Sequence, residues 1–168
     1  MGIIFTSNTL AGFDEGIEAF QHGDYESALQ EFLPSAVQGD IEAQFFLFNM
    51  YARGDGVDED FDKASYWLMQ AAEQGHLASQ MQLAYNYSIG QGVPVDNGKA
   101  VYWMTRAAEQ GDAQTQYDLG EAYYLGDVVL LDHVKSFKWF KQSAEQGHSQ
   151  AVYMLAVSYL LGKGTSQD

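Results

Sequence analysis

The segment Ala36-Val37-Gln38-Gly39-Asp40 returns as AEQGH at residues 72–76, as AEQGD at 108–112 and as AEQGH at 144–148, always 36 residues further along the chain. Other residue types recur in the same frame: Leu47, Leu83, Leu119 and Leu155; Tyr51, Tyr87, Tyr123 and Tyr159; Gly54, Gly90, Gly126 and Gly162; and Trp67, Trp103 and Trp139. So many columns in one register indicate a tandem repeat.

Each unit carries the pattern of two helices, because its apolar residues recur at spacings of three and four. The first helix is predicted over residues 40–53, with Ala43, Leu47 and Tyr51 on its buried stripe. It should end at Gly54, since a residue without a Cβ suits the left-handed conformation that closes a helix.

The second helix should begin at Asp60, whose side chain can accept hydrogen bonds from free backbone N–H groups at the helix start. The same cap recurs at Asp24, Asp96 and Asp132. The buried stripe of this helix comprises Ala64, Trp67, Leu68 and Ala71, and the helix should stop at Gly75. We therefore expect the three tryptophans to be buried between repeats.

A helix with one apolar stripe cannot bury that stripe alone, so repeated hairpins stack and share a continuous core. The sequence predicts an all-α fold of about eight helices, from a first one near residues 9–22 to a last one near 148–161. The connections are short, and no strand pattern is present.

The pattern A-E-Q-G-[DH], A-Q, L-x-x-x-Y-x-x-G-x-G-V-x-x-D-x-x-K-A, followed by Trp, resembles the Sel-1-like repeat, a relative of the tetratricopeptide repeat, over about residues 36–164. Upstream, residues 19–32 resemble a tetratricopeptide-type hairpin. The resemblance implies a right-handed α/α superhelix, or solenoid, that serves as a scaffold for protein interactions, often in bacteria.

The repeat frame predicts one α-solenoid domain over residues 1–168. Its parts are an N-terminal extension at 1–8, a tetratricopeptide-like hairpin at 9–39, three Sel-1-like repeats at 40–75, 76–111 and 112–147, and an incomplete terminal repeat at 148–168.

Two features depart from the pattern. Val128 stands where the second loop glycine is expected, and since a β-branched residue resists positive φ, the third loop should take another path. The terminal helix is strongly apolar, carrying Tyr153, Met154, Leu155, Val157, Tyr159, Leu160 and Leu161. Because a repeat array needs a polar end, we expect either a shortened array or an end covered by another copy or by a partner.

Charge excludes several classes of partner. The chain has 23 acidic and 8 basic residues and a formal net charge of −15, so its field should repel nucleic acid and anionic membranes. Through Asp62 there are 13 acidic residues and only Arg53 as a base. This acidic N-terminal part is either a solvated surface or a docking face for a basic partner. The chain has no cysteine and no apolar run of about 20 residues, which excludes a disulfide framework and a membrane-spanning helix.

No motif indicates catalysis, a cofactor or a metal. His76 and His148 share a repeat position, but they are expected to begin helices two repeats apart, too far from each other to share a metal ion. The acidic loop residues Asp55, Asp58, Glu59, Asp60 and Asp62 lack the order of a calcium loop. The chain is therefore predicted not to be an enzyme.

Stacked hairpins present a concave surface lined by the first helix of each repeat. Beside the buried stripe, the predicted partner-binding residues are Asn49, Met81, Tyr85, Ser88, Tyr117, Glu121 and Tyr124. Tyrosine and methionine among variable polar groups are typical of a recognition surface. The alternative is that the leading column, Phe45, Met81, Tyr117 and Tyr153, is core between repeats.

The sequence thus favours a non-catalytic adaptor that binds a peptide or protein segment, expected to be basic, in this groove. The alternative is a regulatory or assembly module that docks through its acidic N-terminal face or its terminal helix, where self-association is also expected. Location stays open between the bacterial cytoplasm and the periplasm, because a chain without cysteine suits both, and a signal peptide, whose pattern does not start this chain, could have been removed from a longer precursor.

Overall fold

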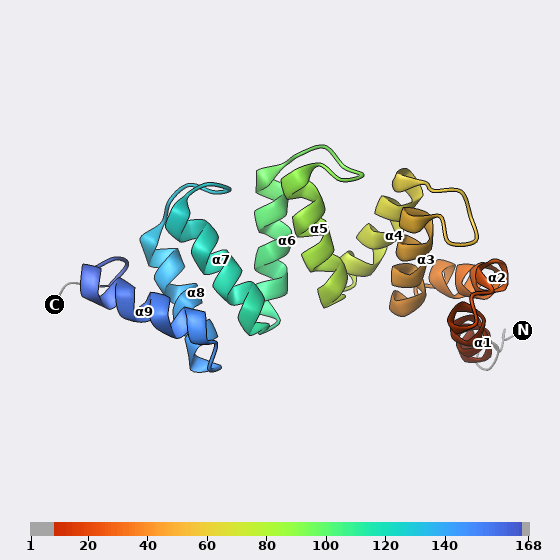
Figure 1. Ribbon diagram of the computed structural model, residues 1–168, viewed down its shortest axis with the longest axis horizontal. Coiled ribbons are helices and arrows are strands. Elements are labelled where there is room, and N and C mark those ends of the chain that lie inside the picture. Colours follow the sequence, from red (N-terminus) through yellow and green to blue (C-terminus); the bar gives the residue numbers. More distant parts are fainter. Residues whose placement is uncertain (1–8, 166–168) are drawn as a thin grey trace, which may run out of the picture. The chain divides into compact units, whose positions relative to one another are not determined.

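The computed structural model describes residues 9–165, and within this range the chain is helical and contains no strand. There are nine helices of 13 residues each: α1 Thr9–Gln21, α2 Tyr25–Val37, α3 Ile41–Arg53, α4 Phe61–Glu73, α5 Leu77–Ile89, α6 Asn97–Glu109, α7 Ala113–Leu125, α8 His133–Glu145 and α9 Ser149–Leu161 (Figure 1). The all-α prediction is confirmed, with nine helices where about eight are expected. The predicted extension at residues 1–8 lies outside the described range.

The described chain divides into two compact units between Ser79 and Gln80, a point inside α5. Unit 1 contains α1 to α4 and the first residues of α5. Unit 2 contains the rest of α5 and α6 to α9. Each unit has buried clusters of its own.

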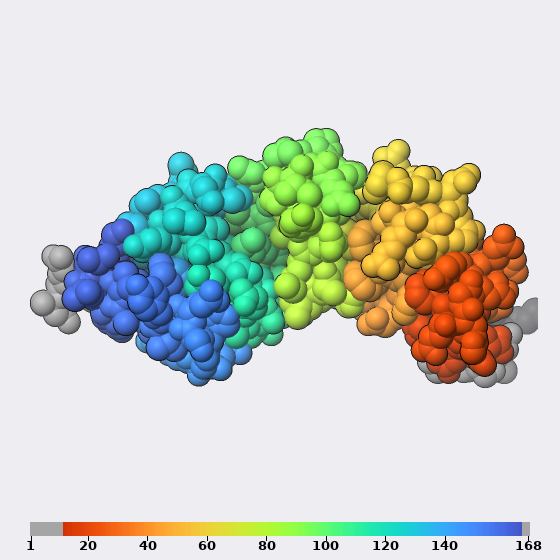
Figure 2. All heavy atoms as spheres, viewed as in Figure 1, coloured from red at the N-terminus to blue at the C-terminus, as the bar shows by residue number. Residues whose placement is uncertain are grey.

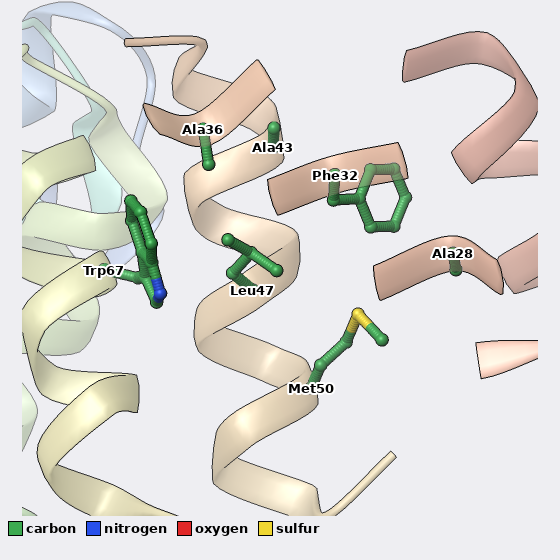
Figure 3. Close-up of a cluster of buried hydrophobic side chains, with 7 residues drawn as sticks. All are labelled: Ala28, Phe32, Ala36, Ala43, Leu47, Met50 and Trp67. Atoms are coloured by element: carbon green, nitrogen blue, oxygen red, sulfur yellow. The ribbon is translucent and has the colours of Figure 1, made fainter. Parts of the chain in front are cut away.

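The core of unit 1 surrounds α3 (Figure 3). Phe32, Leu47 and Met50 are fully buried, and Trp67 is 8% exposed. The Phe32 ring stacks on that of Phe46 with 4.8 Å between centroids. The buried stripes predicted from the repeat frame therefore meet here, and Trp67 on α4 packs against the residues of the other helices.

In unit 2, α8 packs against both α7 and α9, and Figure 2 shows this part of the chain in teal and blue. Trp103 and Trp139 are buried as predicted. Phe140 is fully buried, and a Cβ placed on Gly120 would lie 2.7 Å from its Cδ1 atom. Gly120 therefore makes room in α7 for the ring that α8 presents.

Side-chain caps fix the helix starts. In the second helix of each hairpin, an aspartate accepts from the backbone N–H three residues later; the four are Asp24, Asp60, Asp96 and Asp132. Asp40, Asp112 and His148 cap α3, α7 and α9 in the same way. Gly54 ends α3 with φ 73°, as predicted.

The third loop departs from the other two in its middle. Gly56 and Gly92 have φ of 72° and 68°, whereas no residue other than glycine has positive φ anywhere in residues 9–165. Val128 therefore cannot take the conformation of those glycines, and the loop follows another path, as predicted. It nevertheless closes with the same bond as the first two loops, from Asp132 N to Tyr123 O at 2.9 Å.

Buried glutamines link successive hairpins within each unit. Gln44, Gln80 and Gln116 occupy one repeat column and are almost fully buried. Gln44 donates from Nε2 to Ala36 O at 3.0 Å, and Gln116 donates to Ala108 O at 3.1 Å. The fourth member of this column is Val152, whose side chain is 49% exposed.

Candidate functional site

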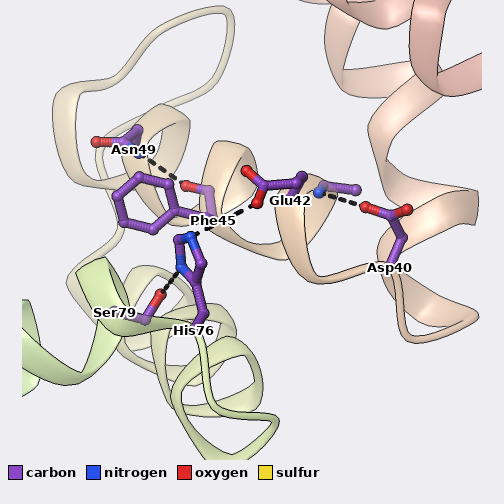
Figure 4. Close-up of polar contacts among 7 residues, drawn as sticks. Asp40, Glu42, Phe45, Asn49, His76 and Ser79 are labelled. Carbon is purple, nitrogen blue, oxygen red and sulfur yellow. Dashed lines mark hydrogen bonds and ion pairs between the residues drawn. The ribbon is translucent and has the colours of Figure 1, made fainter. Parts of the chain in front are cut away.

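In unit 1, the predicted binding residue Asn49 lies on α3 and is half-buried (Figure 4). Its Nδ2 donates to Phe45 O one turn earlier at 2.8 Å. The Phe45 ring meets the imidazole of His76 edge-on, with 4.8 Å between centroids. Asn49 is thus tied to its own helix, and the side chains beside it are an aromatic ring and a histidine.

His76 lies between a carboxylate and a hydroxyl (Figure 4). Its Nε2 is 3.6 Å from Glu42 Oε1, and its Nδ1 hydrogen-bonds with Ser79 Oγ at 2.8 Å. This order resembles a serine–histidine–acid arrangement, but Ser79 is fully buried and cannot reach a substrate carbonyl. The His76 ring instead bonds to a side chain in the first turn of α5.

In unit 2, His148 caps the start of α9, because its Nδ1 accepts from Ala151 N at 3.3 Å. Its Nε2 lies 3.0 Å from Gln114 Oε1. In the part of the chain that the structure describes, no three histidine, aspartate or glutamate side chains are grouped so that they could hold a metal ion.

Unit 2 contains a small cavity beside α5, which we call the α5 pocket. It is lined by Met81, Ala84, Tyr85, Ser88, Met104, Thr115 and Asp118 and has a volume of about 210 Å³. Three of these residues, Met81, Tyr85 and Ser88, are predicted binding residues. Tyr85 is 54% exposed and Met81 is 38% exposed, so both present apolar surface that the core does not use.

Asp118 is the acidic group of the α5 pocket. Gln114 donates from Nε2 to its Oδ1 at 2.7 Å. Partial burial raises the pKa of the Asp118 carboxyl, and the negative charges of Glu121 and Asp112 act in the same direction, whereas the Gln114 bond and His148 lower it. Negative charge is therefore concentrated at this wall of the pocket.

The predicted residues Tyr117 and Glu121 form a bonded pair on α7. Tyr117 is buried, with its ring 5.7 Å from that of Phe140. Its hydroxyl donates to Glu121 Oε1 at 2.8 Å. Burial raises the pKa of Tyr117 to about 12, and the hydrogen bond with Glu121 and its charge add to this. For Tyr117 the structure therefore favours the alternative of core packing over partner contact.

Tyr124 does not line the α5 pocket and is half-buried. Its ring is 5.4 Å from that of His133, and Lys163 Nζ lies 4.6 Å from its centroid. Lys163 also donates to the Tyr124 hydroxyl at 3.3 Å. The residues after α9 therefore cover part of this tyrosine.

The whole repeated region has a family counterpart. A family model for the Sel1 repeat matches residues 41–76, 77–112, 113–148 and 149–168. The chain belongs to the Sel1 repeat family. Each matched Sel1 repeat begins at the first helical residue, one position after the residue with which our predicted repeat begins.

Two solved structures are similar to this Sel1 chain. A protective antigen present in uropathogenic Escherichia coli strains, which displays an SLR fold, is 34% identical with a TM-score of 0.79 over 95% of this chain. A Sel1 repeat protein from Oxalobacter formigenes is 28% identical with a TM-score of 0.77 over 96% of this chain. The alignments span 35% and 65% of those two chains, respectively. A search of curated proteins finds no match.

The sequence prediction missed four residues of the α5 pocket: Ala84, Met104, Thr115 and Asp118. One signal was available for Asp118. It aligns with Phe46, Gln82 and Met154 in the other Sel1 repeats, so this column changes character from repeat to repeat. A variable column beside conserved ones indicates a position that the fold itself does not fix.

In the leading column the four residues behave differently. Phe45 is half-buried and Tyr117 is buried, whereas Met81 and Tyr153 are exposed. Neither of the two predictions for this column therefore holds for all four Sel1 repeats. No helix within residues 9–165 is long and apolar enough to span a membrane.

Proposed function

We propose that this Sel1 repeat chain is a non-catalytic interaction scaffold that binds a peptide or protein segment along the first helices of its repeats. The observation that carries this proposal is the α5 pocket. Met81 and Tyr85 expose their side chains there, beside Met104 and the carboxylate of Asp118. Tyrosine and methionine are enriched where proteins meet because they combine apolar area with adaptable contacts.

The exposure of Tyr85 supports this assignment because the fold does not require it. The tyrosine of the fixed repeat column, Tyr87, is buried two residues later. The residue that aligns with Tyr85 is Asn49 in the first repeat and Glu121 in the third. A large aromatic side chain at a variable, solvent-facing position serves recognition better than it serves packing.

A selection experiment tests the proposal. The full chain is immobilised and panned against a phage-displayed library of random peptides, and affinities of the selected peptides are measured by calorimetry. We expect Tyr85→Ala to weaken binding, and Tyr85→Ala with Tyr124→Ala to weaken it further or equally. Tyr102→Ala is the matched control, since Tyr102 is 52% exposed but lies on α6, the second helix of its hairpin.

Two results would contradict different parts of the proposal. If no peptide is selected, the proposed function is wrong. If peptides bind with equal affinity to the wild type and to the Tyr85→Ala, Tyr124→Ala double variant while circular dichroism shows an intact fold, the assignment to the first helices is wrong.

A second candidate function rests on α9. Its exposed apolar residues include Tyr153 and Leu160, which is 84% exposed. These residues favour a module that assembles through its terminal helix, with another copy or with a partner. Sedimentation across micromolar concentrations tests self-association, and a strictly monomeric chain would contradict it. Docking through the acidic N-terminal face would instead weaken strongly with added salt.

A further inference from the structure

The α5 pocket has the size of a single side chain. Small-molecule sites are commonly about 300–1,000 Å³ in volume. At about 210 Å³ the α5 pocket is below this range, and its lining is largely apolar apart from Ser88, Thr115 and Asp118. It is therefore suited to one long side chain of a bound peptide.

The charge around the pocket selects the chemistry of that side chain. Asp118 has one oxygen, Oδ1, hydrogen-bonded to Gln114, which is a neutral partner. Glu121 and Asp112 are close enough to act on the Asp118 carboxylate with the same sign, and the imidazole of His148 acts against them. A cation placed in the pocket would offset this concentration of negative charge.

The apolar lining suits the rest of a basic side chain. Arginine and lysine carry an aliphatic stem that packs along apolar surface while the charged end reaches a polar partner. Met81 and Met104 provide that surface, and the exposed ring of Tyr85 can interact with the cation through its face.

We propose that the α5 pocket binds an arginine or lysine side chain of the partner peptide, with its charged end hydrogen-bonded to Asp118. This inference rests on the proposed function and specifies its partner chemistry. A charge-assisted hydrogen bond to a carboxylate is stronger than a neutral one and fixes the register of an extended peptide. Asp118 is then a specificity residue that the repeat pattern does not supply.

The pocket is tested first with a single side chain. The full chain, carrying ¹³C-methyl methionine, is titrated with Nα-acetyl-arginine N-methylamide and, separately, with its neutral analogue Nα-acetyl-citrulline N-methylamide. The methyl signals of Met81 and Met104 are expected to shift on addition of the arginine probe, while the signal of the buried Met50 stays in place. The citrulline probe should shift them markedly less.

Asp118→Asn should abolish the response to the arginine probe, because the amide keeps the size of the side chain but loses its charge. Glu109→Gln is the matched control, since Glu109 is exposed on α6 and does not line the pocket. Far-UV circular dichroism confirms that both variants are folded. Equal responses to the two probes, an undiminished response in Asp118→Asn, or no shift of either methionine in the wild type would overturn the proposal.

The selected peptides separate this inference from the proposed function. We expect them to contain an obligatory arginine or lysine, and we expect Asp118→Asn to lower their affinity by roughly tenfold or more. Peptides that bind without a basic residue, or equally well to Asp118→Asn, would overturn the pocket assignment and leave the scaffold function standing. An empty selection would overturn the scaffold function, while the methionine titration still reports on the pocket.

Discussion

Gln74 donates from its side-chain Nε2 to Oε1 of Gln44 at 2.8 Å, although 30 residues separate them in the chain. The same bond joins Gln110 to Gln80 and Gln146 to Gln116, each at 2.8 Å. In every case the donor lies directly after the second helix of a hairpin, and the acceptor lies in the first helix of that hairpin. The repeated AEQG segment therefore forms the turn after the second helix, and its glutamine also joins the two helices of the hairpin by a side-chain hydrogen bond.

Gln116→Ala should destabilise the protein by about 1–3 kcal/mol. The variant removes the amide that donates to Ala108 O and the acceptor of Gln146, and Gln116 itself is buried. Urea denaturation monitored by circular dichroism measures the loss. Gln91→Ala, at an exposed loop position, is the control and should stay close to the wild type. Equal effects of the two changes would contradict a structural role for the buried amide.

Trp103→Ala should cost roughly 3–5 kcal/mol, the range for removing a large buried aromatic side chain. Trp103 is 5% exposed in unit 2. The adjacent Tyr102→Ala removes a ring that is largely in solvent, so we expect a much smaller loss from that change. Thermal unfolding of both variants makes the comparison, and similar melting temperatures would show that the indole does not form part of the core.

Gly120→Ala should have opposite effects in two backgrounds. Alanine is favoured over glycine in a helix by about 1 kcal/mol, but here its Cβ would lie 2.7 Å from Phe140 Cδ1. Overpacking of this kind costs about 1–3 kcal/mol, so the single variant should be less stable than the wild type. In the Phe140→Ala background, where every atom that the new Cβ would meet is absent, the same change should stabilise. A double-mutant cycle measures the coupling, and strictly additive free energies would refute the contact.

The Tyr117 hydroxyl should ionise at a higher pH than that of an ordinary tyrosine. Its pKa is raised from 10.0 to about 12 by burial, so the group retains its proton more firmly in the folded state than in the unfolded state. Its contribution to stability is therefore fully present below about pH 10 and is lost as the pH rises toward 12.

An absorbance titration of the 11 tyrosines should show one phenol that ionises at higher pH than the others, and this phenol should be absent in Tyr117→Phe. The difference in stability between wild type and Tyr117→Phe should shrink over the same interval of pH. A titration without a late phenol, in protein that circular dichroism shows to be folded, would contradict the burial of this side chain.

The repeat frame predicts those features that depend on one residue and its near neighbours. Asp60 caps α4, Gly54 closes α3 and Trp67 is buried, because a cap, a turn and an apolar stripe are local in sequence. The altered course of the third loop also follows from one residue, Val128, since positive φ is strained for any β-branched side chain.

The candidate site could be predicted only in part. Tyr85 and Met81 follow from helix periodicity, and both are exposed where expected. Asp118 and Met104 join them through packing between α5, α6 and α7, which no single helix pattern specifies. Tyr117 is buried for the same reason, because Phe140 on α8 and His148 supply the surfaces that cover it.

Val152 determines how a further helix could be added to this array. It occupies the column where Gln44, Gln80 and Gln116 each accept an amide from the glutamine that follows the next helix. A second helix for the terminal repeat, copied from residues 133–148 and grafted after α9, would bring such a glutamine to the two methyl groups of Val152, which accept no hydrogen bond. Changing Val152→Gln before grafting would supply the missing oxygen, and the grafted helix should dock better with it.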